Sequence, residues 1–132
     1  MSGNKPEGQR LKFIIFKVSD DQKTIEIEEA STDPNYETFR NKLAEVKEAN
    51  GKPAPRYAVY DVEYEHEGKR NKIVFISWVP SGCNIRSSMI YASSREGFKT
   101  ALNVSNSIQA DDKDEIEWKN IVSEASGGKV KA

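Results

Sequence analysis

Residues 68–102 read GKRNKIVFISWVPSGCNIRSSMIYASSREGFKTAL, and this stretch decides the fold. A basic turn leads into Ile73-Val74-Phe75-Ile76, an apolar run of strand length. Trp78-Val79-Pro80 then breaks the strand. The segment that follows, from Ser87 to about Leu102, has the spacing of a helix. The stretch therefore predicts a covered strand followed by a long helix.

The elements around this stretch extend the same pattern. Residues 11–18 form an apolar run, and residues 24–28 alternate between apolar and polar side chains like a partner strand with one wet face. Residues 56–64 lack polar alternation, which is typical of a central strand covered on both faces. The sequence therefore predicts a single α/β domain of α+β character, a central mixed sheet flanked by helices on both faces.

Two more helices and a short strand complete the predicted order. Ser31-Thr32-Asp33-Pro34 resembles a helix start, with a capping residue and then Pro at an early position. The apolar residues that follow at helical spacing are Tyr36, Phe39, Leu43 and Val46. Residues 107–110 are predicted to form the strand, and the terminal helix contains Ile116, Ile121 and Val122.

Length and composition limit the classes to which the protein can belong. The chain has 132 residues, and 20 basic and 21 acidic side chains nearly cancel, so no whole-molecule field favours nucleic acid or an anionic membrane. One cysteine suits a reducing compartment, and no apolar run spans a bilayer. We expect a cytoplasmic protein, with a nuclear pool left open. The predicted domain covers residues 11–125, between flexible segments at 1–10 and 126–132.

The sequence contains no constellation typical of an enzyme. A single His (His66) and a single Cys (Cys83) exclude any site that needs two of either. Asp111, Asp112 and Asp114 lack the glycine turn and distal Glu of a calcium loop, and a solvated helix start explains them better. We therefore expect no catalysis, no metal and no cofactor.

The long predicted helix has two faces on a helical wheel. The residues on the core side are Tyr91, Ser94, Phe98, Ala101 and Leu102. The residues on the opposite side, which is free to meet a partner, are Arg86, Met89, Ser93, Glu96 and Thr100.

Short stretches in a fixed order resemble the actin-depolymerising factor/cofilin family, and together they span residues 11–122. They are Lys12-Phe13-Ile14-Ile15-Phe16, Ser31-Thr32-Asp33-Pro34-Asn35-Tyr36, Arg56-Tyr57-Ala58-Val59-Tyr60-Asp61, Gly68-Lys69-Arg70-Asn71-Lys72-Ile73, Trp78-Val79-Pro80 and Ile85-Arg86-Ser87-Ser88-Met89-Ile90-Tyr91-Ala92-Ser93-Ser94. The insert Asn50-Gly51-Lys52-Pro53-Ala54-Pro55 resembles fungal members of the family.

The resemblance implies the ADF-homology fold and a function in actin dynamics: binding of monomers and filaments, filament severing and depolymerisation. It also implies two binding surfaces and a monomeric protein. The monomer-type surface, on the long helix that enters a cleft of actin, corresponds to Ile85, Arg86, Ser88, Met89 and Ser93. The filament-type surface corresponds to Lys69, Arg70, Lys72 and Glu124, and such basic residues also bind phosphoinositide head groups in the family.

Three departures from the family pattern accompany the resemblance. Only ten residues precede Leu11, where the family has a flexible tail and an amphipathic helix. Ser88 replaces a lysine, and the terminal helix has fewer charges. We expect these departures to weaken binding and severing. Two alternatives stay open: a regulator of the actin-related nucleation complex, like glia maturation factor, and a truncated isoform with little activity.

Overall fold

The structure is a computed structural model that describes residues 11–19, 23–49 and 51–129. The strands are β1 (Phe13–Val18), β2 (Ile25–Ser31), β3 (Arg56–Glu65), β4 (Lys69–Trp78) and β5 (Asn106–Ala110). The helices are α1 (Tyr36–Glu45), α2 (Ile85–Leu102) and α3 (Trp118–Ala125), with a short 3₁₀ helix, η1 (Lys113–Ile116), between β5 and α3.

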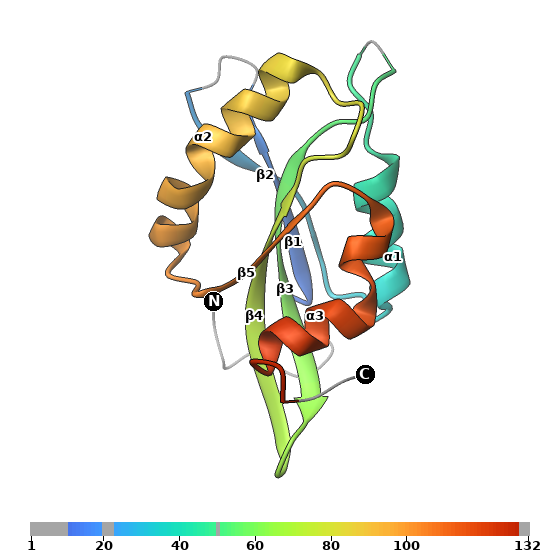
Figure 1. Cartoon of the computed structure of the whole chain (residues 1–132), viewed down its shortest axis with the longest axis vertical. Coiled ribbons are helices and arrows are strands. Elements are labelled where there is room, and N and C mark those ends of the chain that lie inside the picture. The colour runs from blue at the N-terminus through green and yellow to red at the C-terminus, as the bar shows by residue number, and fades with distance from the viewer. Residues whose placement is uncertain (1–10, 20–22, 50, 130–132) are drawn as a thin grey trace.

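The five strands form one sheet in the order β2-β1-β3-β4-β5. All neighbours are antiparallel except β4 and β5, which are parallel and are joined by α2 as a crossover. Helix α2 covers one face of the sheet, and α1 and α3 cover the other (Figure 1). The predicted fold, a mixed sheet with helices on both faces, is confirmed.

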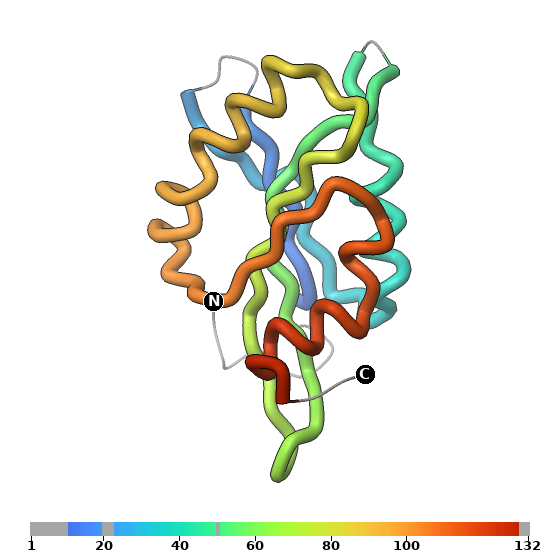
Figure 2. The backbone as a smooth tube through the Cα atoms, viewed as in Figure 1, coloured from blue at the N-terminus to red at the C-terminus, as the bar shows by residue number. Residues whose placement is uncertain are grey.

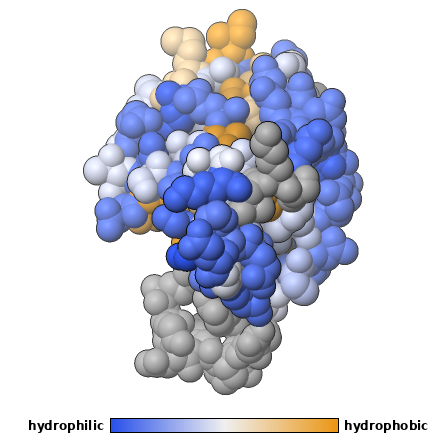
Figure 3. Space-filling view, turned by 60° about the horizontal axis from the view of Figure 1, so that its bottom comes forward, coloured by the Kyte–Doolittle hydropathy of each residue, from blue (hydrophilic) through white to orange (hydrophobic). Residues whose placement is uncertain are grey.

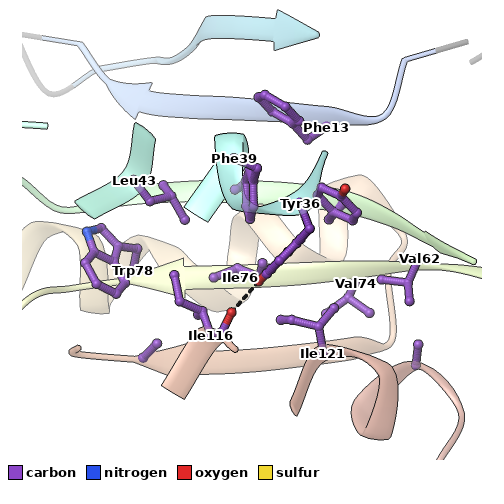
Figure 4. Close-up of a cluster of buried hydrophobic side chains, with 14 of the residues drawn as sticks. Phe13, Tyr36, Phe39, Leu43, Val62, Val74, Ile76, Trp78, Ile116 and Ile121 are labelled. Carbon is purple, nitrogen blue, oxygen red and sulfur yellow. Dashed lines mark hydrogen bonds between the residues drawn. The ribbon is translucent and has the colours of Figure 1, made fainter. Parts of the chain in front are cut away.

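The face under α1 and α3 holds the larger core (Figure 4). Phe39 and Leu43 of α1 and Ile121 of α3 are fully buried against β1, β3 and β4. The Tyr36 hydroxyl donates to the Ile116 carbonyl at 2.5 Å, which joins α1 to the end of η1. Burial raises the pKa of Tyr36 above its ordinary value, so this hydroxyl stays protonated.

The face under α2 is held by aromatic side chains. Phe98 packs against Phe16, Tyr57 and Phe75, with ring centroids 4.9, 5.3 and 6.0 Å away. Tyr91 is the one residue of α2 that is buried, and its hydroxyl accepts the Val18 amide at 2.8 Å. This aromatic cluster fixes the middle of α2 above β1, β3 and β4.

The start of α1 differs from the prediction. Ser31 ends β2, and its hydroxyl accepts the Asp33 amide, while the Asp33 carboxylate accepts the Asn35 amide. These turns use the polar side chains before the helix, and Asn35 is the residue that caps Tyr36–Glu45. The predicted core position of Ala101 is also wrong, because this residue is exposed near the end of α2.

The β3–β4 hairpin extends beyond the rest of the sheet (Figure 1). Ten residues of β3 pair with ten of β4, from Arg56 opposite Trp78 to Glu65 opposite Lys69. The turn needs positive φ at Glu67 (53°) and Gly68 (110°), and glycine meets this need without strain. The basic residues predicted to lie in the turn therefore belong to the first part of β4.

The predicted domain boundaries stay predictions. Residues 1–10 and 130–132 lie outside the described part of the chain. After α3, Ser126 is buried, and the Gly127 and Gly128 amides donate to the Glu124 and Ser123 carbonyls.

A partly buried ion pair ties edge strand β2 to the centre of the sheet. The Arg56 side chain is only 11% exposed, and it donates from Nε and Nη2 to the two Glu28 carboxylate oxygens at 2.7 and 3.1 Å. The remaining nitrogen, Nη1, donates to the Pro55 carbonyl. The hydrogen bonds from Arg56 hold the pKa of Glu28 below its ordinary value of 4.5.

Glu28→Gln should lower the free energy of unfolding at pH 7 by about 1 kcal/mol, since it removes the charge opposite a buried guanidinium. Because the folded-state pKa of Glu28 is lowered, this stability is present above about pH 4.5 and is lost as the pH falls through the folded-state pKa. Urea unfolding from pH 7 to pH 2 should show the mutant and wild-type curves converging in acid. Glu26→Gln, an exposed neighbour, is the control; a constant gap at all pH values would contradict the assignment.

Gly97→Ala should stabilise the protein. Gly97 is exposed inside α2, and a Cβ built there meets no atom within 4 Å. Glycine in a helix interior costs roughly 0.5–1 kcal/mol relative to alanine, so urea unfolding should show a gain of about that size. Gly68→Ala also adds a Cβ in open space, but at a φ of 110° it should destabilise. A loss of stability in Gly97→Ala would refute the expectation.

Candidate functional site

The outer face of α2 exposes two large apolar side chains. Ile85 is 78% exposed and Met89 is 66% exposed, although both side chains favour burial. Arg86 and Ser93 are exposed on the same helix. We call these four residues, Ile85, Arg86, Met89 and Ser93, the α2 face. The structure thus brings together four of the five residues predicted for the monomer-type surface.

The α2 face begins at the helix N-terminus. The Asn84 side chain caps the helix by accepting the Arg86 amide at 2.8 Å. Among the described residues, the Arg86 guanidinium has no ion pair or hydrogen bond. A cation at the first turn of a helix is also unfavourable to the helix dipole. The stability of the fold therefore does not explain Arg86, which is available to a partner.

Ser88 lies apart from the other predicted residues. It is half-buried and lines a hollow of about 360 Å³ between α2 and β5, together with Ala92 and Arg95. Two exposed residues that the sequence analysis did not select, Ala92 and Gly97, continue the outer face of α2. Ala92 follows Met89 by three positions and Gly97 follows Ser93 by four, and this helical spacing was the signal that could have identified them.

The basic residues of β4 lie at the other end of the molecule. Lys69, Arg70 and Lys72 are all exposed, and we call them the hairpin surface. They line a hollow of about 680 Å³ between the hairpin and the turn after α3, which contributes Lys129. Figure 3 shows hydrophilic side chains covering most of this end of the molecule. Arg70 Nε donates to the His66 carbonyl, while Lys69 and Lys72 have no side-chain partner among the described residues.

Contacts with α3 brace the hairpin. The Tyr64 hydroxyl approaches the Ala125 carbonyl at 3.5 Å, and Asn106 Nδ2 donates to the Glu124 carbonyl at 2.9 Å. The Glu124 side chain, however, lines a separate hollow of about 490 Å³ with Asn120. The structure therefore brings together the three predicted cations but not Glu124.

The residues that the sequence analysis considered for catalysis or metal binding take part in packing and hydrogen bonds of the fold. Burial, followed by the nearby Glu48 carboxylate, raises the pKa of the Cys83 thiol, which makes it a weaker nucleophile. The carboxylates of Asp111, Asp112 and Glu115 lie within 4.8 Å of one another. Asp112 caps η1 by accepting the Asp114 and Glu115 amides, and Glu115 accepts the Asp111 amide, so these acids have structural hydrogen bonds. In the described part of the chain, no helix is long and apolar enough to cross a membrane.

Comparisons with known proteins agree with this geometry. The model of the cofilin/tropomyosin-type actin-binding protein family matches residues 4–126. The cofilin of Gibberella zeae is 44% identical over 128 residues, which cover 91% of this chain and 84% of that protein. The cofilin of Saccharomyces cerevisiae is 41% identical over 125 residues, which cover 92% and 82% of the two chains.

Solved structures place the fold in the same group. The crystal structure of Streptomyces griseoflavus cofilin aligns with a TM-score of 0.78 and 37% identity, covering 92% of this chain and 86% of the other. The structure of glia maturation factor from Caenorhabditis elegans aligns with a TM-score of 0.64 and 22% identity, covering 86% and 78%, a likeness of fold alone. The predicted resemblance is confirmed, and the chain belongs to the cofilin/tropomyosin-type family of actin-binding proteins.

Proposed function

We propose that this protein binds actin monomers through the α2 face, with Ile85 and Met89 entering an apolar cleft on actin. The exposure of these two side chains on one helix is the observation that supports the proposal most strongly. Met adapts its shape to a cleft, and the exposed Arg86 beside it supplies a planar group with five donors. Ser88, on the flank of the helix, contacts actin at the edge of this surface.

The hairpin surface contacts a second actin subunit in the filament, and Glu124 adds a separate contact from its own hollow on α3. The hairpin and the N-terminal end of α2 lie at opposite ends of the long axis (Figure 1). A small protein with separate binding surfaces at its two ends can touch two neighbouring subunits at once. Such a contact changes how the subunits fit together, which supports severing and depolymerisation as the outcome.

The hollow at the hairpin surface also suits an anionic head group. Lys69, Arg70, Lys72 and Lys129 line it, and a phosphoinositide head group offers the phosphates that such cations bind. Binding there would compete with the filament. We place the protein in the cytoplasm as a monomer, without catalytic activity, cofactor or nucleic-acid ligand. The fold shared with glia maturation factor does not favour its partner, because the more similar named relatives are cofilins.

The double variant Arg86→Ala/Met89→Ala should weaken the Kd for actin monomers by about 30-fold or more, because each truncation at a binding hot spot costs about 1 kcal/mol or more. Inhibition of nucleotide exchange on monomeric actin is the measurement. Ile27→Ala/Lys119→Ala removes an equally exposed apolar residue and cation elsewhere, and should bind like wild type. Full affinity in the first variant would show that another surface binds the monomer.

The triple variant Lys69→Gln/Arg70→Gln/Lys72→Gln should co-sediment less with filaments, by about tenfold in affinity, and should keep its monomer affinity. Its residual binding should depend less on salt than that of wild type, because exposed charges are screened. Lys23→Gln/Lys113→Gln/Lys119→Gln has the same change in net charge and serves as the control. An equal loss of filament affinity in both triple variants would show that overall charge, and not this surface, causes the effect.

A further inference from the structure

The loop between α1 and β3 lies beside the segment that leads from β4 into α2 (Figure 2). The loop closes on itself at its base, where Lys47 pairs with Pro53 and the Glu48 amide donates to the Lys52 carbonyl at 2.8 Å. The Gly51 amide donates back to the Glu48 carbonyl at 2.8 Å. Glu48 is therefore fixed through its backbone on both sides.

The Glu48 carboxylate reaches the first turn of α2. Ser87, the third residue of α2, donates from its hydroxyl to Glu48 Oε1 at 3.1 Å, across 39 positions of sequence. The other oxygen, Oε2, is buried and has no hydrogen-bond partner in the part of the chain that the structure describes. Desolvating a carboxylate oxygen without a partner is unfavourable, so this contact is not explained by the stability of the loop alone.

The contact also places a negative charge where α2 lacks one. The first turn of α2 contains no acidic residue and does contain Arg86. The exposed backbone amides there have a partial positive charge, which an anion stabilises. Glu48 thus supplies from another element the carboxylate that helices normally have in their own first turn.

The location of this contact connects it with the α2 face. The aromatic cluster holds α2 at Tyr91 and Phe98, whereas Ile85 and Arg86 lie in the first turn, beyond that support. Any fraying or tilting of the first turn moves these two side chains first. A second support at Ser87 fixes their direction.

We propose that Glu48 is a positioning residue for actin binding, which holds the first turn of α2 so that Ile85, Arg86 and Met89 are presented together. The inference rests on the proposed function of the α2 face. Glu48 itself need not touch actin. The role differs from simple stabilisation, because the global fold depends on the two cores and not on this turn.

The first test measures the free protein. Amide hydrogen exchange of residues 88–91 should become about tenfold faster in Glu48→Ala, while residues 98–102 should exchange as in wild type. Glu48→Gln, which keeps an acceptor at Oε1, should restore most of the protection. Glu45→Ala removes an exposed glutamate at the end of α1 and should change nothing. Unchanged exchange in a folded Glu48→Ala protein would overturn the proposal.

The second test measures monomer binding in a double-mutant cycle. Glu48→Ala and Ser87→Ala should each weaken the affinity about fivefold, and the double variant should be no weaker than either single variant. Independent, multiplicative losses would show that the two residues do not act together, and would refute the proposal. If wild-type protein fails to bind monomers, the proposed function fails, and the exchange measurement alone then decides whether Glu48 positions the helix.

Discussion

The pairing of β3 with β4 is the constraint on which the rest of the molecule depends. Ten consecutive residue pairs join the two strands, and β3 also pairs with β1, so it lies at the centre of the sheet. Tyr57 and Tyr60 of β3 are fully buried on opposite faces, and each belongs to one of the two cores. The hairpin turn lies at one end of this strand pair, and the chain leaves the pair after Trp78 at the other end. Both candidate surfaces thus take their positions from one strand pair.

Much of this arrangement could be predicted, because it depends on local patterns. Central strands are buried on both faces, so β3 and β4 appear in the sequence as apolar runs. The outer face of α2 follows from helical spacing, and Met89 is exposed as that spacing predicted, whereas Ile85 was selected through the family resemblance alone. The misplaced start of α1 has a local cause as well. Ser31 and Asp33 have side chains of the kind that cap helices. In the structure these side chains accept backbone amides in turns that precede the helix.

The features that could not be predicted depend on contacts between distant segments. The approach of Glu48 to Ser87 requires knowing how the α1–β3 loop folds, and no periodicity encodes that path. The separation of Glu124 from Lys69, Arg70 and Lys72 depends on how α3 packs against the sheet, which no local pattern encodes. Ala101 is exposed, although Phe98 and Leu102 on either side of it pack against the core, so the wheel placed the edge of the buried face one residue too wide.

The parallel pairing of β4 and β5 affects how the protein binds a partner. Because α2 is the crossover between these two strands, it cannot move away from the sheet without disrupting the pairing of β5 with β4. Its outer face therefore exists before any partner arrives. Association then costs little backbone entropy in this protein, and the remaining entropic cost falls on the exposed side chains. Such a surface favours fast, reversible encounters over slow folding upon binding.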